Sequence, residues 1–573
     1  MIGKFTCLTL GLLFSLLSDV GYAGSATWKP HPVTGDWNNA ANWKPRTIPN
    51  GSSDIATFAV SAPANVFLNS AQIEVDRVVF GPGASAFNIS GSDTAKLLFS
   101  GVGIENNSGM VQNFITNYSE TGALAFTNQA TAGTQTKFTA IGDGSEIDFY
   151  DEASASSADF TLSYSTGFDG YSPVLVFYDT ATAASATVRN VGGFADHSDG
   201  GDTKFFNDST AANATITNNG GLTGAYAGGQ TSFYDNSTAG DSIITNEATP
   251  TNSNYGGATF FNDDATAANA IITCNGAAIA GGGGFGALYF FNTSFAGNAT
   301  LIANGGSNGG AGGLIQFYDD SDAGQARVEL FANGTLDITN GKSSDGVSVG
   351  SLEGDGIVSI GTNKLTIGRN NLSTEFSGVI QGSGTGTGTV VKEGSGTLTL
   401  SGANTYLGYT VVNNGFLRAE NRTGSATGSG AVVVYNSTIG GSGIIGGSVI
   451  LNSLGVLAPG SGATTLTVKG NLTFNASGSY TWRVKTSSAR ADKVTAARGV
   501  RISFASFTGI AIGNTALSPG TTFTAIENTS RSPINGTFDN LTDGGTITIG
   551  NNTFQANYEG GDGNDLTLTV IGN

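Results

Sequence analysis

The middle of this chain repeats itself with a period of roughly 28 residues, and such a period is typical of solenoids and repeat arrays. Each unit is marked by an aromatic pair, Phe followed by Tyr or Phe. An Asp or Asn follows each pair, and an Ala stands six residues after the first Phe in every unit but the fifth, where Ala267 comes one residue late. This repeat limits the folds open to the chain. The seven pairs begin at Phe149, Phe177, Phe205, Phe233, Phe260, Phe290 and Phe317.

The composition of the repeat units indicates β-structure. They are rich in β-branched and turn residues, with period-two alternation and no 3.6-residue period. Two short strands with Gly-rich corners fit one coil of a parallel β-solenoid, whose coils stack ~4.8 Å apart. We therefore predict an all-β fold, a right-handed parallel β-helix (β-solenoid), with the first Phe of each pair stacked in the core.

The second residue of each pair is predicted to point outward, because neighbouring strand residues face opposite sides of a sheet. Tyr is frequent in strands whatever its role, but a row of exposed rings is also a surface against which sugars or a protein partner can stack. We treat this row as a candidate ligand-binding surface, formed by Tyr150, Tyr178, Phe206, Tyr234, Phe261, Phe291 and Tyr318.

The Asp or Asn after each pair is predicted to form a ladder along one corner of the solenoid. Such side chains satisfy backbone groups at turns, and this role is favoured over calcium binding or catalysis. Mixing Asn with Asp also limits repulsion between stacked carboxylates. The predicted ladder consists of Asp151, Asp179, Asn207, Asp235, Asn262, Asn292 and Asp319.

Charge and cysteine content exclude further classes of partner and site. Asp and Glu number 43 against 24 Lys and Arg, so the net charge of −19 has the wrong sign for nucleic acid. Of the two cysteines, Cys7 lies in the leader and Cys274 in the array, so the mature chain cannot form an intramolecular disulfide or a multi-thiolate zinc site.

The N-terminus is typical of an export signal. Lys4 supplies the positive charge, and an apolar run follows at residues 5–17. Gly21 and Ala23 then place small residues at the −3 and −1 positions of the predicted cleavage site. The apolar run is short for a membrane span, and no other stretch approaches 18 apolar residues. We predict a signal peptide over residues 1–23 and no transmembrane segment in the mature chain.

Three of the four tryptophans gather near the start of the mature chain, at Trp28, Trp37 and Trp43. A solenoid needs its first coil covered, because an open end exposes core and unpaired strand edges. We favour an N-terminal cap over a carbohydrate-binding module with Trp platforms. The predicted organisation is then cap and first coils over 24–100, and the repeat solenoid over 101–345.

The residue pattern of the repeat changes after about residue 345. Residues 392–406 read Lys-Glu-Gly-Ser-Gly-Thr-Leu-Thr-Leu-Ser-Gly-Ala-Asn-Thr-Tyr, and residues 410–417 continue with Thr-Val-Val-Asn-Asn-Gly-Phe-Leu. This stretch resembles the autotransporter-associated β-strand repeat, or passenger-associated transport repeat. Residues 560–568, Gly-Gly-Asp-Gly-Asn-Asp-Leu-Thr-Leu, resemble the usual ending of such passengers. We place the repeat region at 346–480 and the end of the β-helix at 481–573.

The resemblance implies a parallel β-helix exported to or beyond the cell surface, with the repeat associated with passenger secretion and folding. The sequence reaches Asn573 without the alternating ~10-residue strands of a C-terminal barrel. We therefore expect a passenger-like chain without its own barrel, with a separate outer-membrane partner as one route. The expected location is secreted or cell-surface, with the periplasm as an alternative.

The sequence contains few candidate catalytic residues in a recognisable arrangement. His31 and His197 are far apart and lack metal-ligand spacing, and the Asp-rich loop at 196–202 is interpreted as a solvated connection between coils. We predict no catalytic site, no metal site and no cofactor. The favoured function is a structural, adhesin-like rod that contacts glycans, extracellular matrix or cell surfaces. The alternative is a carbohydrate-binding or carbohydrate-cleaving β-helix, although fold analogy alone cannot carry an activity.

Overall fold

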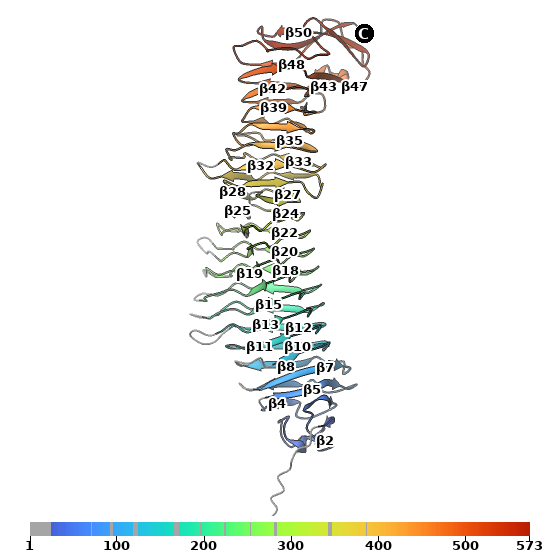
Figure 1. Ribbon diagram of the computed structural model, residues 1–573, viewed down its shortest axis with the longest axis vertical. Helices are drawn as coiled ribbons and strands as arrows, with labels where there is room; N and C mark the ends of the chain where they lie inside the picture. The colour runs from blue at the N-terminus through green and yellow to red at the C-terminus, as the bar shows by residue number, and fades with distance from the viewer. Residues whose placement is uncertain are drawn as a thin grey trace, which may run out of the picture.

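The computed structural model describes residues 24–69, 72–91, 95–117, 124–164, 171–194, 198–222, 225–251, 254–279, 284–341, 346–384 and 387–572. The predicted signal peptide at 1–23 lies outside these residues. The strands lie across a long axis and stack from the N-terminal to the C-terminal end of an elongated rod (Figure 1). The predicted parallel β-solenoid is confirmed, because coil after coil pairs in parallel along two long sheets.

Two sheets carry the repeat array. The first has 16 strands, and in spatial order they are β2 (Trp43–Lys44), β1 (Ala26–Trp28), β3 (Gly51–Phe58), β5 (Gln72–Phe80), β7 (Lys96–Asn106), β9 (Leu124–Phe126), β11 (Glu146–Phe149), β13 (Val174–Phe177), β15 (Asp202–Phe205), β17 (Gln230–Phe233), β19 (Ala258–Phe261), β21 (Ala287–Phe290), β23 (Leu314–Asp319), β25 (Thr335–Gly341), β28 (Ile357–Gly361) and β31 (Val379–Gly382).

The second sheet runs almost the full length of the rod. Its strands are β4 (Asn65–Leu68), β6 (Asn88–Gly91), β8 (Gln112–Asn117), β10 (Thr134–Ile141), β12 (Ser157–Leu162), β14 (Thr187–Asn190), β16 (Thr215–Asn218), β18 (Ile243–Asn246), β20 (Ile271–Cys274), β22 (Thr300–Ala303), β24 (Arg327–Leu330), β27 (Ser351–Gly354), β30 (Thr374–Phe376), β33 (Thr397–Leu400), β35 (Phe416–Ala419), β37 (Thr438–Gly441), β40 (Val456–Ala458), β43 (Ser479–Lys485), β44 (Arg490–Ala491) and β47 (Ser506–Ile512).

Two shorter sheets belong to the C-terminal part. The third is β26 (Val347–Val349), β29 (Lys364–Ile367), β32 (Thr389–Lys392), β34 (Thr410–Val412), β36 (Val432–Tyr435), β39 (Val449–Asn452), β42 (Asn471–Phe474) and β46 (Gly499–Ile502). The fourth is β38 (Ile444–Ile445), β41 (Thr465–Val468), β45 (Lys493–Ala496), β48 (Thr522–Asn528), β51 (Asp565–Gly572), β50 (Asn552–Gly560) and β49 (Thr546–Ile549). Short 3-10 helices occur at Ala40–Asn42 and Thr486–Ser488.

A continuous stack of phenylalanines fills the core on the side of the first sheet. Consecutive rings lie 4.6–4.9 Å apart with interplanar angles of 15° or less, and each side chain is fully buried. In-register parallel pairing produces this stack, because it brings the same position of each repeat together. The array members are Phe126, Phe149, Phe177, Phe205, Phe233, Phe261, Phe290 and Phe317.

This stack corrects one sequence prediction. Phe261 was expected to face outward and Phe260 inward, but Phe233 pairs with Phe261, and Phe260 pairs with Ser232. Phe261 is fully buried, whereas Phe260 lies on the outer face. The corner decides the register, because Asp263, two residues after Phe261, takes the left-handed turn conformation that Asp235 takes after Phe233. Ala267 therefore keeps its regular place six residues after the inward Phe.

A polar ladder inside the core was not foreseen. Asn190, Asn218 and Asn246 are fully buried at the ends of β14, β16 and β18. Asn190 Nδ2 donates to Asn218 Oδ1 (2.7 Å), and Asn218 Nδ2 donates to Asn246 Oδ1 (2.8 Å). Thr hydroxyls and backbone carbonyls of the next coils complete the hydrogen bonds. The ladder ends at Cys274, which accepts from Asn246 Nδ2 at 3.6 Å.

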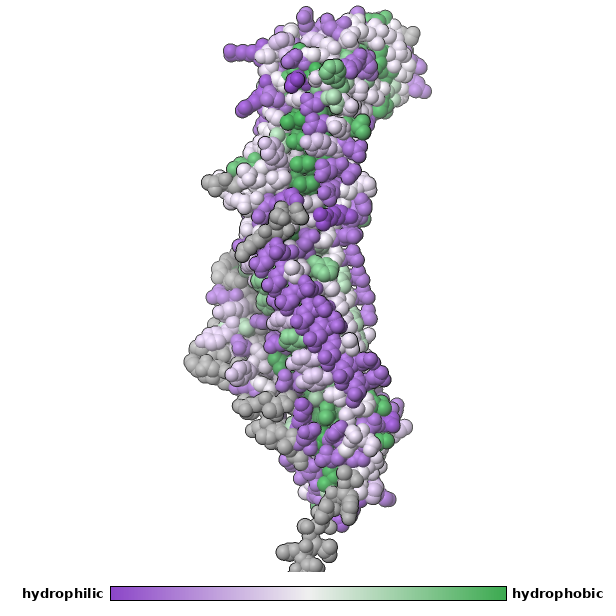
Figure 2. Space-filling model, in the orientation of Figure 1, coloured by the Kyte–Doolittle hydropathy of each residue, from purple (hydrophilic) through white to green (hydrophobic). Residues whose placement is uncertain are grey.

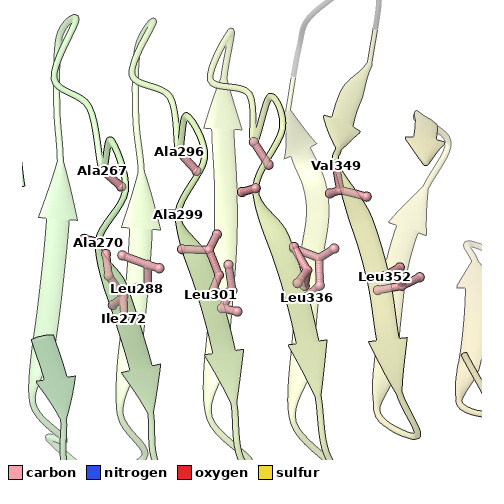
Figure 3. Close-up of a cluster of buried hydrophobic side chains, with 14 of the residues drawn as sticks. Ala267, Ala270, Ile272, Leu288, Ala296, Ala299, Leu301, Leu336, Val349 and Leu352 are labelled. Carbon is pink, nitrogen blue, oxygen red and sulfur yellow. The ribbon is translucent and has the colours of Figure 1, made fainter. Parts of the chain in front are cut away.

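Small and aliphatic side chains fill the rest of the array core (Figure 3). Equivalent side chains return in each coil, as Ala267 and Ala296 do at one corner and Ile272 and Leu301 do on the second sheet. All four are fully buried. Because each coil presents the same set to the next, the core is one cluster that extends from the first coils to the C-terminal strands.

The two ends are closed by antiparallel pairs. At the N-terminus β1 pairs with β2, and Trp28, Trp37 and Trp43 pack their rings together against Phe58. These tryptophans are at most 1% exposed, so the predicted cap is confirmed and they offer no ring platform to a ligand. At the C-terminus β48, β51, β50 and β49 form an antiparallel sheet. Among the described residues, no helix has the length and apolar character needed to cross a membrane.

Candidate binding surfaces

Six of the seven predicted outward residues line up on the outer corner after the first sheet. We call Tyr150, Tyr178, Phe206, Tyr234, Phe291 and Tyr318 the outer aromatic ladder. Each is half-buried. Tyr150 to Tyr234 form an unbroken stack with ring centroids 4.8–5.4 Å apart, and Phe291 stacks on Tyr318 at 4.7 Å. Asn262 takes the position between the two segments, because Phe261 faces inward.

The stacking determines what this ladder presents to a ligand. Interplanar angles of 4–11° in the first segment mean that each internal ring has both faces covered by its neighbours. The ladder therefore offers ring edges and tyrosine hydroxyls, not free ring faces. A ligand would meet the positively polarised edge of each ring, which favours hydrogen-bond acceptors over the C–H groups that pack on ring faces.

A buried carboxyl lies beside the first rung of the ladder. Asp148, on the outer face of β11, is 2% exposed, and its Oδ2 accepts from the Tyr150 hydroxyl at 3.3 Å. Its Oδ1 is buried without a hydrogen-bond partner among the described residues. Burial, reinforced by Glu146, raises the pKa of Asp148 from 3.8 to about 8. The pKa values of Tyr150 and Tyr178 are also raised, mainly by burial.

The Asp/Asn ladder performs turn chemistry, as predicted. Each side chain accepts a hydrogen bond from the backbone N–H of the equivalent residue in the preceding coil, at 2.8–3.3 Å. Its residues have φ of 51–57°, a conformation that Asp and Asn tolerate better than most residues. Asp263 replaces the predicted Asn262 in this ladder, which comprises Asp151, Asp179, Asn207, Asp235, Asp263, Asn292 and Asp319.

Among the described residues, the other acidic candidates do not form a metal site. Within the described part of the chain, no group of three or more His, Cys, Asp or Glu side chains is placed to hold a metal ion. Of the Asp-rich loop at 196–202, Asp196 and His197 lie outside the described residues. Asp202 forms an ion pair with Lys204 at 3.2 Å on the outer face of β15, and burial raises its pKa.

The sequence reasoning missed a set of loops that join each second-sheet strand to the next first-sheet strand. We call residues 191–201, 219–229, 247–257, 275–286 and 304–313 the side loops. Figure 1 shows loops projecting from one side of the rod at this level, and their described parts stack on one another through backbone bonds such as Gly221 N to Tyr255 O (2.8 Å). Backbone bonds also close each loop at its base, as Gly229 N to Asn219 O does (2.8 Å).

The side loops border two of the hollows on the rod. One, of about 250 Å³, lies between the loops and the outer face of the first sheet and is lined by Tyr226, Tyr255, Phe260, Phe285 and Tyr289. A second, of about 410 Å³, lies on the other side of the loops and includes Tyr164 and Phe194, whose rings stack at 5.3 Å. The signal in the sequence was the aromatic residue before Gly in these loops, as in Tyr255-Gly256 and Phe285-Gly286.

A third hollow, the corner cleft, has a volume of about 730 Å³ and lies where the Asp/Asn ladder begins. Asp76, Asp151 and Glu152 contribute carboxylates to its wall. The face of the rod in Figure 2 is largely hydrophilic along its middle, with hydrophobic patches that are small and separate. The face shown in Figure 2 therefore carries no broad apolar patch among its described residues.

Comparison with known proteins identifies one segment of the C-terminal half. The family model of the passenger-associated-transport-repeat matches residues 390–419, which run from β32 to β35. This chain contains a passenger-associated transport repeat. Over 104 residues it is 36% identical to the Adhesin BmaC autotransporter of Brucella suis biovar 1 (strain 1330). That match covers 18% of this chain and 3% of the adhesin, so the chain spans a small part of its relative's length. The resemblance predicted from residues 392–417 is confirmed.

Proposed function

We propose that this protein is an exported, adhesin-like rod that contacts glycans, matrix or cell surfaces and has no catalytic activity. The observation that carries the proposal is the single core that runs from Ala26 to Val570 beneath in-register ladders. Such a rod holds surface features at fixed spacing and far from its ends. The similarity of one segment to an autotransporter adhesin supports the same role.

Export by a signal peptide and a final location at the cell surface or in the medium belong to this proposal. Fractionation of the producing cell, with protease shaving of intact cells, tests the location. Protease-accessible or released protein agrees with the proposal. Strict retention in the periplasm contradicts it and favours a scaffold of the envelope.

The outer aromatic ladder is the surface that we propose for attachment. A quadruple variant with Ser at Tyr150, Tyr178, Tyr234 and Tyr318 loses the phenol rings and their hydroxyls, while the buried Phe stack remains. We expect the far-UV circular dichroism of the purified mature chain to be kept and its attachment to host cells or matrix to be lost. A quadruple Tyr→Phe variant is the matched control, since it keeps the rings and removes only the hydroxyls. Unchanged attachment of the Ser variant would show that the ladder is not the contact surface.

A carbohydrate-cleaving enzyme remains the second candidate because of the corner cleft. Its volume of about 730 Å³ lies within the ~300–1,000 Å³ of typical ligand sites, and it holds three carboxylates. Each of these carboxylates already has a structural partner: Asp76 pairs with Arg77, Asp151 accepts from Asn128 N, and Glu152 accepts from Gln129. Incubating purified protein with polysaccharides and measuring new reducing ends tests this candidate. Activity that Glu152→Gln abolishes would favour it over the adhesin proposal.

A further inference from the structure

The hollow beneath the side loops is formed by a local change in the repeat. On the outer face of the first sheet, one column of paired residues reads Val174, Asp202, Gln230, Ala258, Ala287 and Leu314 from coil to coil. Ala258 and Ala287, in two successive coils, have smaller side chains than their neighbours in the column, Gln230 and Leu314. Ala258 and Ala287 therefore form the floor of a cavity of about 250 Å³. We call this cavity the loop groove.

Aromatic rings form the walls of the loop groove from two directions. Phe260 and Tyr289 stand on the sheet and stack at 5.2 Å, while Tyr226, Tyr255 and Phe285 come from the side loops. Tyr226 is 48% exposed and Tyr255 is 45% exposed, so these two rings are open to solvent.

Polar groups that are available to a ligand surround these rings. The side-chain amides of Gln230 and Asn254 and the hydroxyl of Tyr289 make no hydrogen bond to any other described residue. Amide groups both donate and accept, and a tyrosine hydroxyl does the same. The loop groove therefore offers apolar faces together with hydrogen-bonding groups that can serve both the donor and the acceptor functions of a ligand.

The groove is also free of charge. None of its lining residues is Asp, Glu, Lys, Arg or His, although the chain carries 43 acidic residues and a net charge of −19. A cationic partner would find its counter-charges elsewhere on this rod, and an anionic one finds none here. The ligand that fits is neutral, has apolar C–H faces to pack against rings, and has hydroxyls for the amides.

We propose that the loop groove binds a neutral hexopyranose unit of a glycan. This inference rests on the adhesin-like function proposed above and adds a second contact site to the outer aromatic ladder. One sugar ring suits a cavity somewhat smaller than the ~300–1,000 Å³ of larger ligand pockets. A single unit binds weakly, with a Kd of roughly 1 mM. Many rods on one cell surface would raise the overall strength by multivalency.

The test uses the purified full mature chain and matched neutral and acidic probes. The neutral probes are cellohexaose, mannohexaose and chitohexaose, and the acidic probe is hexagalacturonate, all at up to ~10 mM so that weak binding is seen. Saturation-transfer NMR and calorimetry measure binding. We expect at least one neutral probe to bind and hexagalacturonate to bind at least tenfold more weakly.

Substitutions locate the site. Ala258→Leu fills the groove with a residue that the same column already holds at Leu314, so the sheet should accommodate it. We expect Ala258→Leu and Tyr255→Ala each to weaken binding at least tenfold. Thr335→Leu in the same column and Tyr171→Ala, an 81% exposed tyrosine outside the groove, are the matched controls and should bind like the native chain.

The outcomes separate this inference from the proposed function. Neutral-glycan binding that survives both Ala258→Leu and Tyr255→Ala overturns the site, as does a preference for the acidic probe. Absence of neutral binding in a protein that still attaches to cells overturns the inference and leaves the adhesin-like function standing. Binding in the groove by a protein that attaches to no surface supports the inference and contradicts the proposed function.

Discussion

The repeat array and residues 346–480 form one continuous core with different side chains. We call residues 346–480 the transport-repeat region, after the repeat matched at residues 390–419. In the array, one coil takes roughly 28 residues, as from Val188 through Ile216 to Ile244 on the second sheet. From β33 to β43 one coil takes only roughly 20 residues. On the second sheet, the core of these shorter coils is filled by aliphatic side chains in place of Phe and Asn stacks. These are Leu398, Leu417, Ile439 and Leu457.

This difference indicates a division of labour within one rod. The additional residues of the array coils form the projecting side loops, which border hollows. The array also carries the outer aromatic ladder. The transport-repeat region uses compact coils with aliphatic stacks and a third sheet. The binding features proposed above therefore all lie in the array and the coils that begin it. Four predictions test this contrast, beginning with the largest effect.

Removing one ring from the Phe stack should have the largest effect on stability. Phe205 is fully buried and stacks on Phe177 and Phe233 at 4.8 and 4.7 Å. Phe205→Ala loses the ring and leaves a cavity, and should cost about 3–5 kcal/mol. Hydrogen exchange of backbone amides should show lost protection centred on β13, β15 and β17.

The matched substitution in the other region is Leu417→Ala, with an expected cost of about 2–5 kcal/mol. Because coils contact mainly their neighbours, each variant should lose protection locally and spare the distant region. Equal loss of protection along the whole rod in either variant would mean that the two regions unfold as one unit.

Breaking the buried asparagine ladder should have the next largest effect. Asn218 donates to Asn246 and the Ala258 carbonyl and accepts from Asn190 and Thr231. Asn218→Ala leaves several of these groups buried without partners and should cost about 2–3 kcal/mol in urea unfolding.

Cys274→Asn is the matched control, because Cys274 occupies the next place in the same ladder. Asn at this place extends the ladder, so we expect a change of less than about 1 kcal/mol. A larger penalty for Cys274→Asn than for Asn218→Ala would contradict a ladder held by repeated amide hydrogen bonds.

The two regions should respond in opposite ways to pH. In the array, the folded pKa of Asp148 is about 8, above its ordinary 3.8, so the folded chain binds more protons and stability falls as pH rises from about 4 to 8. In the transport repeat, burial lowers the pKa of Lys392 from 10.5 to about 8. The unfolded chain then binds more protons, and stability rises between about pH 8 and 10.5.

Each slope is at most about 1.4 kcal/mol per pH unit. Melting temperatures followed across pH should become flatter below pH 8 in Asp148→Asn and flatter above pH 8 in Lys392→Met. Lys392 Nζ donates to the carbonyls of Glu393, Gly394 and Asn414, so the Met variant also loses these hydrogen bonds. The change of its melting temperature with pH is therefore compared with its own overall stability. A pH profile that neither substitution alters would assign the titration to other groups.

The smallest expected effect lies at the junction of the two regions. Arg327 of β24 donates to both carboxylate oxygens of Glu353 of β27, at 2.8 and 2.7 Å. Because the Arg327 side chain is 45% exposed, Glu353→Gln should cost only about 0.5–1 kcal/mol at low salt and less at ~1 M salt. Urea midpoints at the two salt concentrations measure this, and a cost that salt does not reduce would contradict a solvent-screened pair.

Several features could be predicted from the sequence because they depend on period alone. A regular repeat of aromatic, turn and alanine positions leads to stacked coils, and stacked coils align equivalent residues. The inward Phe stack and the turn role of the Asp/Asn ladder follow from that argument. The Trp cap follows from the need to cover the first coil. The roles of the outer aromatic ladder and the proposed export remain predictions.

Other features depended on contacts that no period encodes. Phe260 and Phe261 are chemically identical neighbours, and only the corner at Asp263 decides which of them enters the core. Asn190, Asn218 and Asn246 read as turn residues in the sequence, yet their amides pair across coils inside the core. The distinction requires knowing which coil lies above.

The sequence by itself therefore determined the fold class, the cap and the main ladders. The ladders follow because parallel backbone pairing places equivalent residues of successive repeats next to each other. The tertiary structure alone decided register, exposure and the loop groove. The groove arises because Ala258 and Ala287, in separate coils, become neighbours beneath loops that contribute Tyr226 and Tyr255. Such a site depends on which residues of different coils lie next to each other. The packing of the coils sets the distance between those residues, and their separation along the chain does not.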